Sequence, residues 1–295
     1  MHTSHPDHKP QWFTRPLTTD GRLGEVAAVL RETGLITVCA EARCPNRIEC
    51  FSAGTATFLI LGDVCTRNCR FCAVKSGAPG PADHSEPSRL ALAAEKLKLT
   101  HVVVTSVTRD DLPDGGAGHF AAVIRAVRGR CPDAGVEVLT PDFQGRTVPL
   151  ETVLDAGPDV FAHNIETVPR LYVKARPGAS YERSLDLLSR ASAFDPTCPV
   201  KSGIMLGMGE TDDEIETVLT DMRDAGVWFL TLGQYLAPGT DFLPVARWVH
   251  PDEFARWETR ARELGFTAVA SGPLVRSSYK AGDMVTRSRE YFRKV

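Results

Sequence analysis

Most of the cysteines in this sequence fall into two groups of three within one short stretch. The stretch CAEARCPNRIEC has the spacing C-x4-C-x5-C, and the stretch CTRNCRFC has the spacing C-x3-C-x2-C. Closely spaced thiolates are typical ligands of zinc and of iron–sulfur clusters. We call Cys39, Cys44 and Cys50 the upstream cysteines, and Cys65, Cys69 and Cys72 the loop cysteines. Their crowding favours metal ligation over disulfide cross-linking.

The spacing of the loop cysteines is compatible with two kinds of metal site. A structural zinc ion needs four ligands, so an upstream cysteine or His84 would have to complete the set. A 4Fe–4S cube held by three thiolates instead keeps one iron without a protein ligand, and that iron can bind a substrate or cofactor. Residue types and spacing alone leave both interpretations open.

The other two cysteines, Cys131 and Cys198, stand alone in the sequence. We interpret them as packing or surface residues. A chain of 295 residues is large enough to fold without disulfides. A reducing cytosol would also disfavour them.

The overall composition is that of an ordinary globular protein, with 43% apolar and 24% charged residues. A net charge of -3 and an isoelectric point near 6.3 give no electrostatic signature of nucleic-acid or anionic-membrane binding. No apolar run reaches the roughly 20 residues of a membrane span. The amino-terminal segment also lacks the pattern of a secretory signal. These features predict a cytoplasmic protein without nucleic-acid or membrane partners.

From residue 55 onward, β-branched apolar runs alternate with helical patterns. Alternating strands and helices predict parallel strands with right-handed crossovers, in an open doubly wound sheet or a (β/α) barrel. The predicted strands are 55–64, 101–107, 136–141, 159–166, 200–207 and 228–236. The predicted helices lie near 86–98, 117–129, 147–156, 180–193, 211–225 and 251–264. In both architectures active-site residues lie at the carboxyl ends of the strands. The stretch CTRNCRFC comes directly after the first predicted strand, so it is expected at this end.

Two further helix signals are visible. Residues 21–33 carry apolar side chains at helical spacing, and Gly34 is a suitable carboxyl-terminal stop. Thr211 and Glu214 form a capping-box pattern at the start of the helix predicted near 211–225.

The spacing C-x3-C-x2-C after a first strand, with Phe71 before the last cysteine, resembles the signature of radical S-adenosylmethionine (SAM) enzymes. Further segments occur in the order seen in one family of these enzymes, the lipoyl synthases, and the resemblance spans about residues 22–282. The segments are CAEARCPNRIECF, GTATFLILGDVCTRNCRFCAV, VTSVTRDDLPDGGAGHF, HNIETVPRLY, KSGIMLGMGET and SGPLVRSSYKAG.

The resemblance implies an α/β fold, a partial (β/α)6 TIM-like barrel whose amino- and carboxyl-terminal extensions carry an auxiliary cluster. The implied division of the chain is a flexible tail (1–20), an extension with the upstream cysteines (21–54), the barrel (55–250) and a carboxyl-terminal helix and extension (251–295).

The family also implies S-adenosylmethionine and two 4Fe–4S clusters as cofactors. The loop cysteines Cys65, Cys69 and Cys72 would hold the SAM-binding cluster. The upstream cysteines Cys39, Cys44 and Cys50, with Ser278 of the segment RSSY, would hold the auxiliary cluster. Taken alone, a serine such as Ser278 is far more often a turn or helix-cap residue.

The implied reaction inserts sulfur at C6 and C8 of an octanoyl chain attached to a carrier-protein lysine, with sulfur from the sacrificed auxiliary cluster. An aliphatic C–H bond has no acid–base handle, so radical abstraction is one of the few routes to this reaction. The implied partners are octanoylated E2 lipoyl domains and glycine cleavage H protein, a ferredoxin or flavodoxin as electron donor, and an iron–sulfur carrier that rebuilds the cluster. The alternatives are another radical SAM sulfur-inserting or methylthiolating enzyme, or a non-catalytic zinc or iron–sulfur module.

Five polar residues at or beyond the ends of predicted strands are candidate contacts of SAM. Asn164 and Glu166 could bind its ribose or amino group, and Arg176 its carboxylate, which a planar guanidinium suits. Thr105 and Ser106 end another predicted strand. Each of these residues could equally be an ordinary polar side chain at a strand-to-loop boundary.

Overall fold

The computed structural model describes residues 9–14, 21–41, 44, 46–52, 57–279 and 281–285. Most of the predicted flexible tail, residues 1–20, lies outside the described residues, as do residues 286–295. Within the part of the chain that the structure describes, no helix combines the length and apolar composition needed to cross a membrane.

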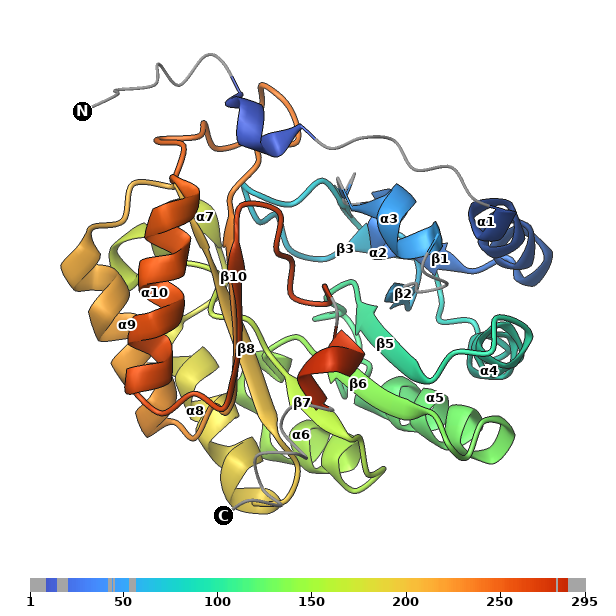
Figure 1. Ribbon diagram of the computed structural model, residues 1–295. Coiled ribbons are helices and arrows are strands. Elements are labelled where there is room, and N and C mark those ends of the chain that lie inside the picture. The colour runs from blue at the N-terminus through green and yellow to red at the C-terminus, as the bar shows by residue number, and fades with distance from the viewer. Residues whose placement is uncertain are drawn as a thin grey trace.

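One curved sheet of eight strands forms the centre of the molecule (Figure 1). Seven strands run parallel, and one short strand, β1 (Ile36–Thr37), pairs antiparallel with β2 at one edge. The parallel strands are β2 (Thr57–Ile60), β5 (His101–Ser106), β6 (Gly135–Leu139), β7 (Val160–Ala162), β8 (Val200–Leu206), β9 (Phe229–Gln234) and β10 (Ala268–Gly272). The first six correspond to the six predicted strands, and the predicted partial barrel is confirmed.

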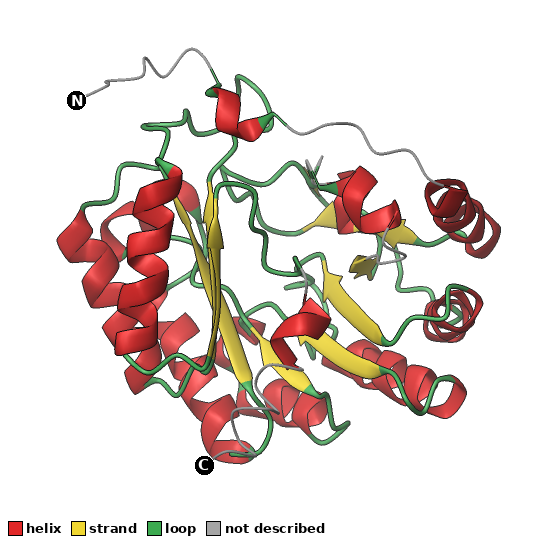
Figure 2. Ribbon diagram, in the orientation of Figure 1, coloured by secondary structure: helices red, strands yellow, loops and turns green. Residues whose placement is uncertain are grey.

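Strands alternate with helices along the chain, and the helices cover the outer face of the sheet (Figure 2). All six helices predicted between the strands are present. They are α4 (Glu86–Lys96), α5 (Ala117–Arg130), α6 (Thr147–Leu154), α8 (Tyr181–Phe194), α9 (Asp212–Asp224) and α10 (Pro251–Glu263). The predicted capping box also forms, because the Thr211 hydroxyl accepts from the Glu214 backbone while the Glu214 carboxylate accepts from the Thr211 backbone.

Several short elements complete the fold. The predicted first helix is α1 (Gly21–Thr33), and Gly34 follows it with a φ of 61°. The others are η1 (Gln11–Phe13), α2 (Val38–Glu41), α3 (Arg47–Ser52), β3 (Val64–Cys65), β4 (Lys75–Ser76), η2 (Phe143–Gly145), η3 (Pro169–Leu171) and α7 (Tyr172–Ala175).

The core lies between the sheet and its outer helices. All four residues of β2 are buried, and the inner faces of α4 and α5 meet the sheet through side chains such as Leu90, Phe120 and Ile124. Burying one such large apolar side chain stabilises the fold by about 1.5–3 kcal/mol. This packing fixes the carboxyl ends of the strands, from which the loops of the site extend.

The carboxyl-terminal segment crosses the open side of the barrel between β10 and β2. Gly233 on β9 permits the close approach, because a Cβ there would stand 2.2 Å from the Val275 carbonyl oxygen. Further on, the Ser278 Oγ lies 2.8 Å from Thr57 Oγ1 at the start of β2. Residues 281–285 are helical, and Met284 packs against the first residues of three barrel strands, Val160, Phe229 and Ala268. The segment from Ser278 to Met284 therefore connects β2 with β7, β9 and β10.

A buried ion pair lies inside the barrel near the amino ends of the strands. Lys201 Nζ donates to Glu137 Oε1 at 2.7 Å, and both side chains are at most 2% exposed. His101 Nε2 lies 3.4 Å from the other Glu137 oxygen. Burial alone would raise the pKa of the Glu137 carboxyl, but Lys201 and His101 reverse this effect and lower it from 4.5.

The sign of this shift predicts how stability depends on pH. The Glu137 carboxyl has a higher pKa in the unfolded chain than in the folded protein. Its contribution to the free energy of unfolding is therefore complete above about pH 4.5 and is lost as the pH falls through the lowered folded pKa. Replacing one partner leaves an uncompensated buried charge, so Lys201→Met should cost about 3–5 kcal/mol at neutral pH. The double variant Glu137→Leu/Lys201→Met should cost much less. Urea denaturation of the metal-free proteins between about pH 7 and about pH 4 measures both effects. If the free energy of unfolding of the double variant fell with decreasing pH as steeply as that of the parent, the assignment would be contradicted.

Candidate active site

The loop cysteines lie directly after β2, in a loop pinned at both of its ends. Cys65 ends β3, which pairs with β4, and the Cys65 carbonyl accepts from the Gly77 backbone at 2.9 Å. The Cys65 sulfur itself accepts two backbone hydrogen bonds, from Arg67 at 3.4 Å and from Thr108 at 3.3 Å. These bonds fix the position of the Cys65 sulfur.

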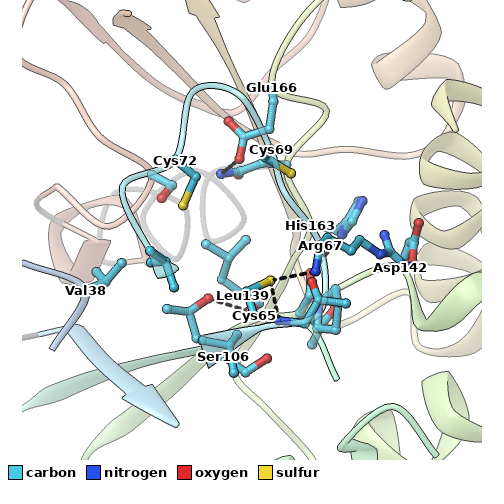
Figure 3. Close-up of a pocket in the computed structure, with 18 of the residues that line it drawn as sticks. Val38, Cys65, Arg67, Cys69, Cys72, Ser106, Leu139, Asp142, His163 and Glu166 are labelled. Carbon is cyan, nitrogen blue, oxygen red and sulfur yellow. Dashed lines mark hydrogen bonds and ion pairs between the residues drawn. The ribbon is translucent and has the colours of Figure 1, made fainter. Parts of the chain in front are cut away.

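The loop cysteines share one cavity of about 250 Å³ at the carboxyl ends of the strands. Figure 3 shows them around it, with Glu166 beside Cys69. All five predicted SAM contacts also line this cavity: Thr105, Ser106, Asn164, Glu166 and Arg176. Val38 and Thr57, which neighbour Cys39, reach the same cavity. The structure therefore brings together residues from β2, β5 and the segments after β7.

The loop thiols fit an iron–sulfur cube by their chemistry. Burial raises the pKa of Cys69, and it raises that of Cys72 to about 12, so these sulfurs need a cation beside them to be held as thiolates. Within the described ranges, no three His, Cys, Asp or Glu side chains are placed to hold a single metal ion. A cube binds each thiolate through a different iron, so its ligands surround it without meeting at one point.

Four buried polar atoms of the cavity residues have no hydrogen-bond partner in the described structure. They are Ser106 Oγ, Thr140 Oγ1, Asn164 Oδ1 and Arg176 Nε. Leaving such an atom unsatisfied costs about 1–3 kcal/mol, so these atoms indicate a polar ligand. Thr105 differs, because its hydroxyl already donates to the Leu139 carbonyl at 2.9 Å.

Arg176 and Glu166 form the most strongly charged part of the cavity wall. Arg176 Nη1 donates to the carbonyls of Asn164 and Ile165 at 3.0 and 3.1 Å, which fixes the guanidinium plane. Glu166 has a φ of 70°, which is unusual for a residue with a side chain and occurs mostly at functional sites. Burial raises the pKa of its carboxyl, which the nearby guanidinium of Arg176 and a hydrogen bond from Asn164 oppose.

The residues that hold the cysteine loop in place were not among the predicted site residues. Arg67, inside the loop, donates to Asp110 at 2.7 Å and to the fully buried Asp142 at 2.6 Å. Arg183 on α8 binds the other Asp142 oxygen at 2.7 Å. Burial opposes the ionised form of Asp142, but Arg67 outweighs it and holds the pKa of that carboxyl far below its usual range. Two features of the sequence could have indicated these residues. Arg67 is a charged residue between the loop cysteines, and Asp142 is an aspartate just after a predicted strand.

The upstream cysteines and the segment RSSY are adjacent in space. Cys39 lies on α2 and Cys50 on α3, with Cys44 between them. Thr57, whose hydroxyl donates to Ser278, is also a neighbour of Cys39. Burial lowers the pKa of Arg276, and a Cys44 thiolate beside it acts in the opposite direction.

Two further contacts dock the carboxyl-terminal segment on α3 and its preceding turn. Asn46 Nδ2 donates to the Leu274 carbonyl at 2.6 Å, and the Tyr279 hydroxyl donates to Glu49 at 2.9 Å. The structure therefore places Ser278 with the upstream cysteines, although it comes from the other end of the sequence.

The remaining candidates lie elsewhere. Cys198 is buried and donates weakly to the Pro158 carbonyl at 3.4 Å, and Cys131 packs at the edge of the core, as expected for packing residues. His84 is exposed and is not among the residues that line the cavity.

Comparisons with known proteins define the class of this chain. The family model of the radical SAM superfamily matches residues 59–222. The fold resembles Streptococcus suis SuiB bound to its precursor peptide SuiA (TM-score 0.58, 10% identity, 84% of this chain and 52% of that one). It also resembles methylornithine synthase (TM-score 0.54, 15% identity, 86% and 75%). The chain is a radical SAM enzyme.

Curated relatives narrow this class to one family. A lipoyl synthase of Methylococcus capsulatus is 56% identical over 277 residues, which cover 94% of this chain and 86% of the relative. One from Caldanaerobacter subterraneus subsp. tengcongensis is 53% identical over 274 residues, covering 92% and 95%. The chain therefore belongs to the lipoyl synthase family. The predicted activity, radical SAM-dependent sulfur insertion, is confirmed, and its cofactors are S-adenosylmethionine and two 4Fe–4S clusters.

Proposed function

We propose that the loop cysteines Cys65, Cys69 and Cys72 hold the SAM-binding cluster and that SAM occupies the rest of the same cavity. One observation carries this proposal: three partly buried thiols line the same cavity as the unpartnered polar atoms of Ser106, Asn164 and Arg176. When bound, the cluster and SAM supply a 5′-deoxyadenosyl radical. The protein positions them and excludes side reactions.

The cavity residues have distinct proposed roles toward SAM. Arg176 presents Nε to the SAM carboxylate while its Nη1 stays anchored on the backbone. Asn164 Oδ1 and the Glu166 carboxylate accept from the amino group or ribose, which are donors. Ser106 is free to bond a further polar atom. Thr105 is a packing contact, because its proton is committed to Leu139.

We further propose that the upstream cysteines Cys39, Cys44 and Cys50, together with Ser278, hold the auxiliary cluster that supplies sulfur. The hydrogen bond between Ser278 and Thr57, and the proximity of Thr57 to Cys39, support this grouping. An oxygen is a poor match for iron in a thiolate-rich cluster, so Ser278 gives the cluster one weak corner. Such a corner suits a cluster that is dismantled during each reaction.

The proposed substrate is an octanoyl chain on the lysine of a carrier protein, an E2 lipoyl domain or the glycine cleavage H protein. Apolar residues of the cavity, including Val38, Leu59 and Val107, suit an aliphatic chain. A ferredoxin or flavodoxin would supply electrons, and an iron–sulfur carrier would rebuild the auxiliary cluster. The proposed location is the cytoplasm, where thiols stay reduced.

The proposed domain division keeps the functional parts separate along the chain. Residues 21–54 carry the upstream cysteines, 55–250 form the radical SAM barrel, and 251–295 carry Ser278, after a flexible tail at 1–20.

Mass spectrometry of an octanoyl-lysine peptide tests the proposed substrate. The peptide is incubated anaerobically with SAM, dithionite and reconstituted protein. A gain of two sulfur atoms is the expected result. The matched control is the same peptide with an unmodified lysine, which should gain none. Formation of 5′-deoxyadenosine without any sulfur gain on octanoyl-lysine would contradict the assigned substrate.

A further inference from the structure

The Thr57 side chain lies between two residues that are proposed ligands of the same cluster. Thr57 begins β2 and is 6% exposed. Its hydroxyl donates to Ser278 Oγ at 2.8 Å, across a sequence separation of 221 residues. Thr57 is also a neighbour of Cys39. One residue therefore contacts both the amino-terminal and the carboxyl-terminal part of the proposed ligand set.

Proton counting fixes the direction of the Thr57–Ser278 bond. A threonine hydroxyl has one proton to donate. A serine oxygen that ligates a metal has lost its proton and can only accept, so Thr57 must be the donor. Its single proton is then committed to Ser278. Donation to a ligating, negatively charged oxygen is also the stronger kind of hydrogen bond.

The two partners differ in how firmly the fold holds them. Thr57 is fixed by the parallel register of β2 with β5, where it stands opposite Val103. Ser278 lies in a turn after β10. An oxygen binds iron in such a cluster only weakly. The position of the Ser278 oxygen therefore depends on hydrogen bonds from neighbouring residues.

We infer that Thr57 is a positioning residue, which holds the Ser278 oxygen toward the upstream cysteines through its hydroxyl. The inference rests on the proposed ligand role of Ser278. Thr57 belongs to the barrel, whereas the proposed ligands of the auxiliary cluster come from the two ends of the chain.

The test compares Thr57→Val, which replaces the hydroxyl by a methyl group, with Thr57→Ser, which keeps the hydroxyl. Both are made in a full chain that also carries Cys65→Ala, Cys69→Ala and Cys72→Ala, so that the remaining iron belongs to the upstream group. Iron release to a chelator is followed after anaerobic reconstitution. Thr57→Val should release iron about tenfold faster, as expected for one lost hydrogen bond to a charged group. Thr57→Ser should restore the parent rate.

A control and a second readout separate positioning from general damage. Thr231→Val removes the hydroxyl of another buried strand threonine, one that is not among the cavity residues, and should release iron at the parent rate. The Mössbauer component of the oxygen-ligated iron should change in Thr57→Val and stay unchanged in Thr57→Ser and Thr231→Val. Thr57→Ala serves as a second hydroxyl-free variant if Thr57→Val does not fold.

Two different results would overturn the inference. If Ser278→Ala releases iron faster while the hydroxyl-free Thr57 variants match the parent in rate and spectrum, Thr57 has no positioning role and the ligand assignment stands. If Ser278→Ala itself matches the parent in rate and spectrum, the ligand assignment fails and the inference about Thr57 fails with it.

Discussion

The triple variant Cys65→Ala/Cys69→Ala/Cys72→Ala is expected to lose all SAM cleavage and to keep the upstream iron. Two four-iron cubes give about eight iron atoms per chain, so reconstituted variant should hold about four. Formation of 5′-deoxyadenosine should fall to the level of a protein-free control, because the thiols that face the cavity are gone. Iron and sulfide analysis, with chromatography of the nucleoside products, measures both quantities.

The matched control is Cys131→Ala, which removes a thiol at the edge of the core that is not among the cavity residues. It should keep about eight iron atoms and full cleavage of SAM. If the triple variant of the loop cysteines instead kept eight iron atoms per chain, those cysteines would not be the ligands of a cluster.

The second large effect is expected from Cys39→Ala/Cys44→Ala/Cys50→Ala. This variant should also hold about four iron atoms per chain. It should still cleave SAM, since the loop cysteines and the cavity residues facing them are intact. Sulfur insertion into octanoyl-lysine should stop, because the proposed sulfur source is absent. The ratio of 5′-deoxyadenosine to thiolated peptide measures this uncoupling.

A variant without the upstream cysteines that still made lipoyl product would show that the sulfur comes from elsewhere. Ser278→Ala gives an intermediate comparison, since it removes one weak ligand and leaves the three thiols in place. Its product yield should lie between those of the parent and the triple variant.

The barrel strands and outer helices could be predicted because the pattern of apolar residues in their sequences matches the positions that are buried in the structure. Strands such as β5 and β8 are buried over most of their length and contain the apolar runs VVV and IML, which is typical of parallel strands. The strand β10 was missed, since its sequence AVASG is built from small residues with low strand propensity and is recruited by pairing with β9. Two-residue strands such as β1 carry no periodic signal at all.

The candidate site was only partly accessible from the sequence. The loop cysteines follow a predicted strand, so their position at the barrel mouth followed from local pattern. The adjacency of Ser278 and Cys39 came only from the family resemblance, because no spacing rule links residues so far apart. Arg67, Asp142 and Thr57 were missed, since each acts through a partner that only the tertiary fold brings near.

The docking of the carboxyl-terminal segment on α3 and β2 constrains when the protein can be matured. A chain made from its amino end exposes Cys39, Cys44 and Cys50 early, whereas Ser278 appears only after β10 has been made. Chains fold from the amino end as they are synthesised. The full proposed ligand set of the auxiliary cluster thus exists only on a nearly finished polypeptide, so this cluster would be inserted after translation rather than during it.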